Sequence, residues 1–350
     1  GKSTLFNCLT RGEIAAENYP FCTIEPNVGM VPVPDPRLDQ LAAIEEPEKI
    51  IPTTMQFVDI AGLVAGASKG EGLGNKFLAH IRETDAIAHI VRCFEDDDVT
   101  HVAGRVDPIS DIETIDTELT LADLESAEKA LYRTAKQSKS GDKEAKALSE
   151  LLERVVAHLG EGNPVRCMEL SSDERKALRE WHFITAKPVL YVANVDDTAN
   201  AENPMVAKVT EHASGSDAGV VVVSAAMEAE LAQLDPQEQA EFLADLGETE
   251  PGLNRLIRAG YDLLDLLTFF TAGPKEVRAW TVHRGATAPQ AAGRIHTDFQ
   301  KGFIRAEVTA FDDYIACNGE TGAKAAGKLR LEGKEYIVKE GDVMHFRFNV

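Results

Sequence analysis

The first four residues, Gly1-Lys2-Ser3-Thr4, have the types and the order that bind phosphate at the start of a helix. They match the end of the GxxxxGK[ST] loop. There, backbone N–H groups surround phosphates, the Lys reaches the β and γ oxygens, and the hydroxyl binds Mg²⁺. The first Gly of that motif and the strand before it are absent from this sequence, so we expect an incomplete phosphate loop. The tetrapeptide alone is therefore a weak indication.

A second phosphate-binding element follows a predicted strand at 54–60. Asp59-Ile60-Ala61-Gly62 matches DxxG, in which the Asp holds Mg²⁺ through water and the Gly amide approaches the γ-phosphate. Thr23 lies between the two motifs, where a threonine completes the Mg²⁺ shell when the γ-phosphate is bound. Ser3, Thr23 and Asp59 are therefore the predicted Mg²⁺ ligands, although an ordinary turn would explain Asp59–Gly62 by itself.

Two later predicted strands end in residues that could hold a base: 188–194 ends at Asn194-Val195-Asp196-Asp197, and 219–224 at Ser224-Ala225. The usual element here is NKxD, whose Lys packs on the base and whose Asp pairs with guanine. Val195 replaces that Lys, whereas Asp197 keeps the acid in register, so these residues leave GTP as a candidate. The predicted nucleotide-binding residues are Gly1, Lys2, Ser3, Thr4, Gly62, Asn194, Val195, Asp197, Ser224 and Ala225.

The elements that must position these residues form an α/β pattern. Predicted strands at 54–60, 86–92, 188–194 and 219–224 alternate with helical stretches, which indicates a parallel sheet with crossover helices. The motifs then lie at the carboxyl ends of strands, where open α/β sheets bind their ligands. We predict a P-loop nucleotidase domain over 1–110 and 186–268, a helical insertion over 111–185 and a β-rich domain over 269–350.

The helical insertion shows two apolar stripes that predict an α-hairpin with its turn at 137–142, and a coiled coil is one form that such a hairpin can take. Ser171 and Glu174 predict a capping box at the start of a further helix. The stripes are Leu121, Leu124, Ala127 and Leu131, and Leu148, Leu152, Val155 and Leu159.

The net charge of −22 repels nucleic acid at long range, so no DNA partner is expected and any RNA contact requires a local basic patch. The five cysteines show no CxxC or CxxH spacing, which argues against zinc and disulfides. No apolar run approaches the ~20 residues of a membrane helix, so we expect no membrane partner. The cytoplasm is the expected compartment.

These residues together resemble the Obg-like ATPases of the YchF family, within the Obg group of P-loop proteins. Gly62–Leu78 looks like the Obg-type glycine-rich switch. The segments Phe270–Thr281 and Gly293–Glu307 are similar to the family's TGS domain, a small ubiquitin-like β-grasp module. The resemblance covers essentially the whole chain.

The resemblance implies three domains and a preference for ATP over GTP, ascribed to an NxxE element in place of NKxD. Asp197 stands where that Glu is expected. The resemblance also implies a ribosome partner, either the large subunit or the whole particle, contacted by the helical hairpin and the TGS domain. The local basic patch would consist of Lys275, Arg278, Lys301, Arg305 and Lys328.

Leu63 stands where Ras-like enzymes carry the glutamine that orients the attacking water. His101 matches the histidine proposed to support hydrolysis in the family. We therefore expect an ATP-hydrolysing switch protein that docks on the ribosome. A GTPase of the Obg group and a nucleotide-dependent adaptor with incidental hydrolysis are the alternatives.

Overall fold

The computed structural model describes residues 1–10, 28–60, 73–96, 106–138, 142–196, 203–216 and 218–349, without the side chains of 73–76. The chain forms two compact units, each with its own internal packing. The first consists mainly of Val58–Leu256 together with Gly1–Cys8, and the second mainly of Val28–Phe57 and Ile257–Val350.

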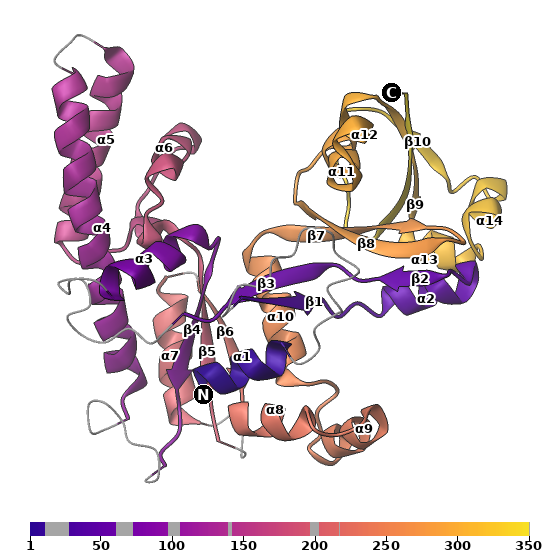
Figure 1. Cartoon of the computed structure of the whole chain (residues 1–350), viewed down its shortest axis with the longest axis horizontal. Coiled ribbons are helices and arrows are strands. Elements are labelled where there is room, and N and C mark those ends of the chain that lie inside the picture. The colour runs from indigo at the N-terminus through magenta and orange to yellow at the C-terminus, as the bar shows by residue number, and fades with distance from the viewer. Residues whose placement is uncertain are drawn as a thin grey trace. The chain divides into compact units, whose positions relative to one another are not determined.

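The first unit is built on a parallel sheet whose strands are β4 (Ile87–Arg92), β5 (Val189–Asn194) and β6 (Gly219–Val223), in that order (Figure 1). Every residue of the central strand β5 is buried, as expected for an unbroken apolar run in a parallel sheet. Because the strands are parallel, their carboxyl ends lie at one edge of the sheet.

Helices surround this sheet or lead away from it. Asn203 caps α7 with its side chain, and Asp235 and Glu238 form a capping box at α9. The helices are α1 (Lys2–Thr10), α3 (Leu73–Glu83), α7 (Pro204–Ser214), α8 (Ala225–Leu231), α9 (Pro236–Asp245) and α10 (Gly252–Leu263), the last of which contains the boundary between the two units.

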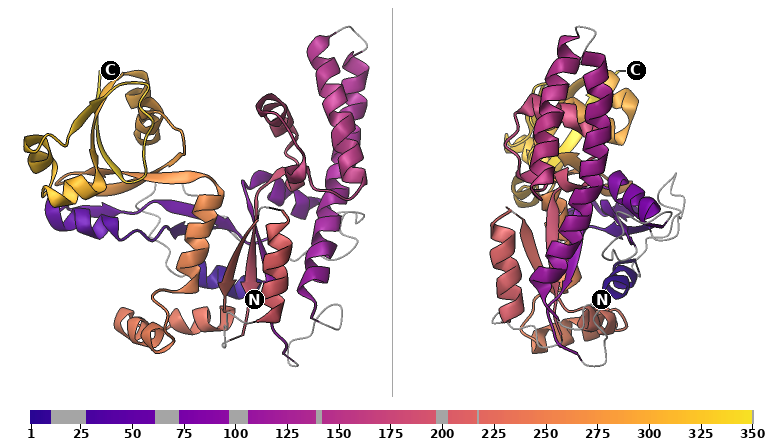
Figure 2. Two further views of the ribbon diagram at one scale, coloured as in Figure 1. Left: turned by 180° about the vertical axis from the view of Figure 1, so that it is seen from behind. Right: turned by 90° about the vertical axis from the view of Figure 1, so that its left-hand side faces the viewer.

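Most of the described residues between β4 and β5 are helical. The two long helices, α4 (Pro108–Ser138) and α5 (Lys143–Gly160), form a hairpin that projects beyond the sheet of the first unit (Figures 1 and 2). Asp142 caps α5, and the predicted capping box of Ser171 and Glu174 starts α6. The remaining short helices are η3 (Val165–Cys167), α6 (Ser172–Leu178), η4 (Arg179–Trp181) and η5 (Ile184–Ala186).

One residue of the predicted stripes is misplaced. Ala127, Leu152 and Val155 are buried in the hairpin core, but Leu121 is 40% exposed. The reason is that α4 changes partners along its length. Its outer half packs on α5, whereas its inner half packs on α3 and η5 through a different face that contains Leu119 and Ala122.

The second unit contains a six-stranded sheet in the order β10-β9-β11-β7-β8-β2, and a two-stranded sheet of β1 and β3. In the larger sheet β2 pairs in parallel with β8. The strands are β1 (Val28–Pro32), β2 (Lys49–Ile51), β3 (Thr54–Val58), β7 (Leu266–Ala272), β8 (Glu276–His283), β9 (Phe303–Ala310), β10 (Arg330–Glu332) and β11 (Asp342–Phe348).

Helices cover both faces of the larger sheet. Phe269 packs in a core with α11, while its neighbour Phe270 faces a second core with α2 and α13, because successive strand residues point to opposite faces. The helices are α2 (Arg37–Glu45), α11 (Ala288–Ile295), α12 (Thr297–Lys301), α13 (Phe311–Ala316) and α14 (Glu320–Ala325).

In the last strand, β11, Met344 and Phe346 are buried, but Phe348 is 36% exposed. A register shift between Arg347 and Phe348 ends the regular pairing with β9, and the Phe348 ring stacks on Phe299 at 3.7 Å between centroids.

The predicted α/β fold class, with a parallel sheet, many helices and a C-terminal β domain, is confirmed. The three domain boundaries remain a prediction. Within the described part of the chain, no helix is both long and apolar enough to span a membrane.

Candidate functional site

The two predicted phosphate-binding elements lie next to each other. Lys2 starts α1, Asp59 follows β3, and the Lys2 Nζ forms an ion pair with the Asp59 Oδ1. The side chains are 37% and 16% exposed, so a ligand can reach both. The structure thus brings the lysine of the phosphate loop to the carboxylate of the DxxG element, 57 residues away in the sequence.

The end of β5 lies beside the start of the chain. A Cβ atom built on Gly1 would lie 3.4 Å from the Asn194 Nδ2, so the phosphate element and the predicted base element are neighbours. Asn194 is buried, and its backbone carbonyl accepts a hydrogen bond from the Cys93 N–H at 2.8 Å.

The side chain of Asn194 has a defined orientation. Its Oδ1 accepts the Ala225 N–H at 2.9 Å, which assigns the oxygen to that side because a backbone N–H can only donate. The Nδ2 is the donor group that faces Gly1. Purine N7 is an acceptor in adenine and in guanine alike, so Asn194 can bind either base without choosing between them.

Three other predicted residues make contacts within the fold. Ser224 caps α8 by accepting the Met227 N–H at 3.2 Å. The Val195 N–H donates to the Val223 carbonyl at 3.0 Å, and its side chain is buried. The Ala225 N–H is already used by Asn194, so in this structure its role is to hold that side chain.

The donor types at the phosphate end suit Mg²⁺, which prefers hard oxygen ligands. Ser3 is exposed on α1 directly after Lys2, and the Asp59 carboxylate is accessible. Thr4 lies in the same turn, where its Oγ1 is 3.5 Å from the Gly1 nitrogen. Thr23, Gly62, Leu63, His101 and Asp197 lie outside the described residues.

Asn203 supports the edge of the site, although it is not among the residues predicted from the sequence. Its Oδ1 accepts the N–H groups of Met205 and Val206, and its Nδ2 donates to the Cys93 carbonyl at 2.9 Å. Cys93 in turn bonds Asn194, so the cap of α7 supports the edge of the site. The Asn-Pro pair at 203–204 is the signal, since Asn before Pro marks a helix start.

Burial raises the pKa of the Cys93 thiol to about 11. The thiol is therefore neutral near pH 7 and is not a nucleophile, because thiolate is the reactive form. No covalent role for this cysteine follows from its place beside Asn194.

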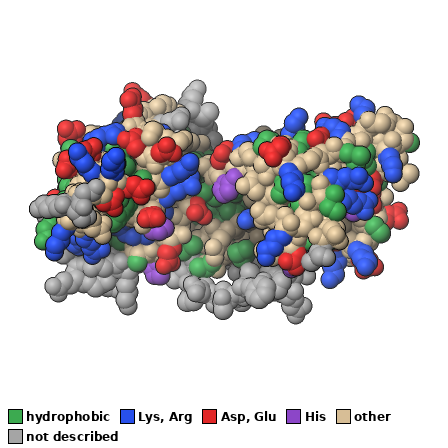
Figure 3. Space-filling view, turned by 90° about the horizontal axis from the view of Figure 1, so that it is seen from above, with side chains coloured by type: hydrophobic (Ala, Val, Ile, Leu, Met, Phe, Trp, Pro, Cys, Tyr) green, Lys and Arg blue, Asp and Glu red, His purple; other side chains and the backbone are tan. Residues whose placement is uncertain are grey.

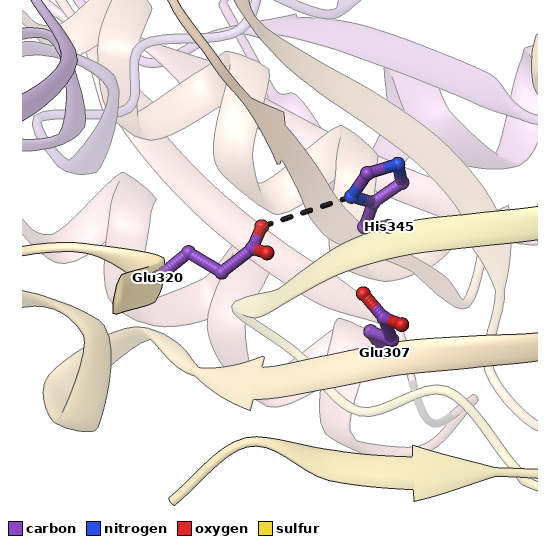
Figure 4. Close-up of side chains that lie close together, drawn as sticks. All are labelled: Glu307, Glu320 and His345. Atoms are coloured by element: carbon purple, nitrogen blue, oxygen red, sulfur yellow. Dashed lines mark ion pairs between the residues drawn. The ribbon is translucent and has the colours of Figure 1, made fainter. Parts of the chain in front are cut away.

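The second unit contains a cluster of possible metal ligands: Glu307 on β9, Glu320 on α14 and His345 on β11 (Figure 4). Their ligand atoms lie within 4.8 Å of one another, and the His345 Nδ1 is 3.7 Å from the Glu320 Oε2. However, Arg347 donates two hydrogen bonds to Glu307, at 3.2 and 3.0 Å, and lowers the pKa of that carboxyl. The geometry is that of a surface ion-pair network.

Similarity to known proteins extends over the whole chain. Residues 266–349 match the family model YchF-GTPase_C, described as a protein of unknown function (DUF933), and residues 1–130 match the family described as 50S ribosome-binding GTPase. The chain is 63% identical over 350 residues to the Ribosome-binding ATPase YchF of Haemophilus influenzae, covering 100% of this chain and 96% of that protein. The protein of the same description from Bacillus subtilis is 54% identical over 353 residues, with the same coverage.

A solved structure has the same fold. The Schizosaccharomyces pombe YchF GTPase superposes with a TM-score of 0.88 at 36% sequence identity, covering 99% of this chain and 94% of that one.

Proposed function

The chain belongs to the YchF family, and from this premise we propose that it is a P-loop nucleoside triphosphatase that binds ATP with Mg²⁺, hydrolyses it and associates with the ribosome. The observation that carries the nucleotide site is the convergence of Lys2 with Asp59 and of Gly1 with Asn194. These contacts join a phosphate element, a Mg²⁺ element and a base element in one place.

At the phosphate end, Lys2 and the backbone amides of Gly1–Thr4 bind the phosphates. The ion pair of Lys2 with Asp59 supports this role, because it places a cation and a Mg²⁺-binding carboxylate within contact distance. When Mg²⁺ is bound, Ser3 and Thr23 would hold it directly and Asp59 through water, and the Gly62 amide would contact the γ-phosphate. Bound Mg²⁺ supplies charge neutralisation for phosphoryl transfer.

At the base end, Asn194 donates from Nδ2, and the backbone around Val195 and Ser224 borders the base. ATP is preferred because Val195 cannot supply the lysine stem of NKxD, and because the bacterial relatives carry the name ATPase. The alternative is a GTPase, since Asp197 keeps the acid in register and the S. pombe relative is described as a GTPase.

Hydrolysis requires a group that orients the attacking water. Leu63 is apolar and cannot do so, whereas a histidine that titrates near neutral pH is suited to the task. We assign this role to His101.

The charge distribution supports a ribosome partner. Residues 266–349 contain 12 Lys and Arg against 10 Asp and Glu, a net charge of +2, so the rest of the chain carries −24. Lys275, Lys301, Arg305 and Lys328 are exposed there, and Figure 3 shows Lys and Arg side chains on the visible face of this region. RNA is polyanionic, so the C-terminal region is the part of the chain that it repels least.

The large subunit is the part of the ribosome that we propose as the docking partner. The description of the family matched by residues 1–130 names the 50S particle, which supports this choice. Association with ribosomes places the protein in the cytoplasm.

The test is ATP binding and ATP hydrolysis by the purified protein, with and without ribosomes, alongside a Lys2→Ala variant. Loss of a charge-assisted hydrogen bond costs about 1.5–3 kcal/mol, so we expect Lys2→Ala to bind ATP about 10–100 times more weakly. Lys208→Ala is the matched control, because Lys208 is an exposed lysine on α7 of the same unit.

The outcomes separate the alternatives. Unchanged ATP affinity in Lys2→Ala would contradict the site. GTP competing about tenfold more tightly than ATP would favour the GTPase. Nucleotide-dependent ribosome binding without turnover would favour the adaptor.

A further inference from the structure

Asp123, in the middle of α4, is a fully buried carboxylate with an unusually complete set of donors. Its oxygens accept the Ile184 N–H at 3.0 Å, and the Thr185 N–H and hydroxyl at 2.7 Å each. Both partners lie in η5, directly before β5. A buried charge persists only when hydrogen bonds replace its water, so this joint fixes α4 to the sheet at one point.

Arg82, in the last turn of α3, adds a third element to the joint. Its guanidinium donates to the Asp123 Oδ1 at 3.3 Å, to the Ser126 Oγ at 3.0 Å and to the His182 carbonyl at 3.1 Å. The planar fork of arginine holds its donors on three separate nitrogens, so it spans acceptors that lie farther apart than the single ammonium nitrogen of a lysine can reach. Arg82 thus contacts α4 and the segment before β5 simultaneously.

Apolar contacts surround the polar joint. Leu78 and Ile81 of α3 pack with Leu119 and Ala122 of α4 and with Ile184. Beyond Ser126, α4 packs on α5 in the separate hairpin core. The Arg82–Asp123 contact therefore lies at the base of the hairpin, where the core of the first unit meets it.

The place of α3 in the sequence connects the Arg82–Asp123 contact to the nucleotide site. The helix follows residues 61–72, which continue the DxxG element, and such segments in P-loop switch proteins rearrange with the γ-phosphate. We propose that Arg82 couples α3 to the hairpin, so that nucleotide bound at Lys2 and Asp59 changes the setting of α4 and α5. This inference rests on the proposed nucleotide-binding function.

The proposed coupling can be removed without unfolding the protein. Without Arg82, Asp123 keeps the three donors from Ile184 and Thr185, and the apolar contacts of Leu78 and Ile81 remain. An Arg82→Ala variant should therefore fold and bind nucleotide while losing the polar contacts between α3 and α4.

Hydrogen–deuterium exchange with and without Mg²⁺ and a non-hydrolysable ATP analogue tests this. In the unsubstituted protein we expect nucleotide to change exchange in α1, in α3 and in the hairpin, residues 118–160. In Arg82→Ala the changes in α1 and α3 should remain and the hairpin change should be lost. Arg82→Lys should be intermediate, because the ammonium keeps the positive charge but its single nitrogen does not span the acceptors on α4 and before β5 as the guanidinium does.

Arg154→Ala is the matched control, since Arg154 bonds Glu174 and the Glu169 carbonyl within the helical region and forms no hydrogen bond or ion pair with the described residues of α3. It should respond to nucleotide like the unsubstituted protein. The coupling would be overturned if nucleotide changed exchange in the hairpin as much in Arg82→Ala as in the unsubstituted protein. It would also be overturned if nucleotide changed exchange in α1 of the unsubstituted protein but not in its hairpin. No response even in α1 would overturn nucleotide binding itself, and the inference with it.

Discussion

Half-buried ionisable side chains in the first unit show how a single residue can make stability depend on pH. His89 lies on β4 opposite Tyr191 of β5, with the two ring centroids 5.7 Å apart. Burial lowers the pKa of His89 to about 4, and the positive charges of Arg166 and His212 act in the same direction. Asp116, 3.7 Å from Arg166, is the acidic group of this cluster, and burial raises its pKa.

The direction of the pH effect follows from the pKa of His89 in the folded and in the unfolded chain. The folded pKa of His89 is below the unfolded value of about 6.5, so the unfolded chain takes up the proton first. Its stabilising contribution is complete above about pH 6.5 and is lost as the pH falls toward 4. We expect about 2 kcal/mol of unfolding free energy to be lost between pH 7 and pH 5 through this residue.

Urea unfolding of a His89→Gln variant at pH 7 and pH 5 measures this contribution. The variant should lose about 2 kcal/mol less than the unsubstituted protein over that interval. His283→Gln, at an exposed histidine of β8, should leave the difference unchanged. Equal losses in His89→Gln and the unsubstituted protein would contradict the assignment.

At the scale of elements, α4 contributes to three cores. Its inner half packs on the sheet through Ile112 and on α3 and η5 through Leu119 and Ala122, and its outer half packs on α5 through Ala127 and Ala130. A helix can do this only if its apolar stripe changes face where the partner changes, which explains the exposed Leu121.

A pair of leucine substitutions tests this division. Leu152 is fully buried between the two hairpin helices, so Leu152→Ala should destabilise the hairpin by about 2–5 kcal/mol through a cavity. Leu121→Ala is the same chemical change at an exposed position of α4 and should cost less than about 1 kcal/mol. Native-state hydrogen exchange of the α5 amides reports both values. Comparable costs at the two positions would show that the hairpin core is not where the structure has it.

At the scale of the whole molecule, charge is divided unequally along the chain. The net charge of +2 over residues 266–349 contrasts with −24 over the remainder. Because an acidic surface repels RNA and counterion release favours cations on phosphate, ribosome binding through this region should weaken steeply with salt.

Lys301→Glu tests which surface binds the ribosome, because Lys301 is exposed at the end of α12. Co-sedimentation with ribosomes over a series of KCl concentrations should show weaker binding and a log–log salt slope reduced by about 1. Lys208→Glu carries the same change of charge in the first unit and should bind nearly as the unsubstituted protein does. The reverse order of effects would place the docking surface outside the C-terminal region.

Features that depend on neighbours along the chain could be read from the sequence alone. The strands at 87–92, 189–194 and 219–223 and the capping box of Ser171 and Glu174 were predicted to within a residue or two. These features follow from apolar runs and from hydrogen bonds over three residues, which leave a local signature. The phosphate-loop tetrapeptide and the family resemblance belong to the same class, because their residue types are read in order.

Contacts between distant segments were decided by the tertiary structure. Which groups Lys2, Asn194 and Asp123 bond depends on partners 57, 31 and 62 residues away, and no local pattern encodes those distances. Arg82 and Asp123 looked like ordinary polar residues of two helices until packing buried the carboxylate. Burial removes water from a charge, so the buried carboxylate needs hydrogen-bond donors from the protein. The close-packed fold therefore links Arg82 and Asp123, two residue types that usually lie on the surface.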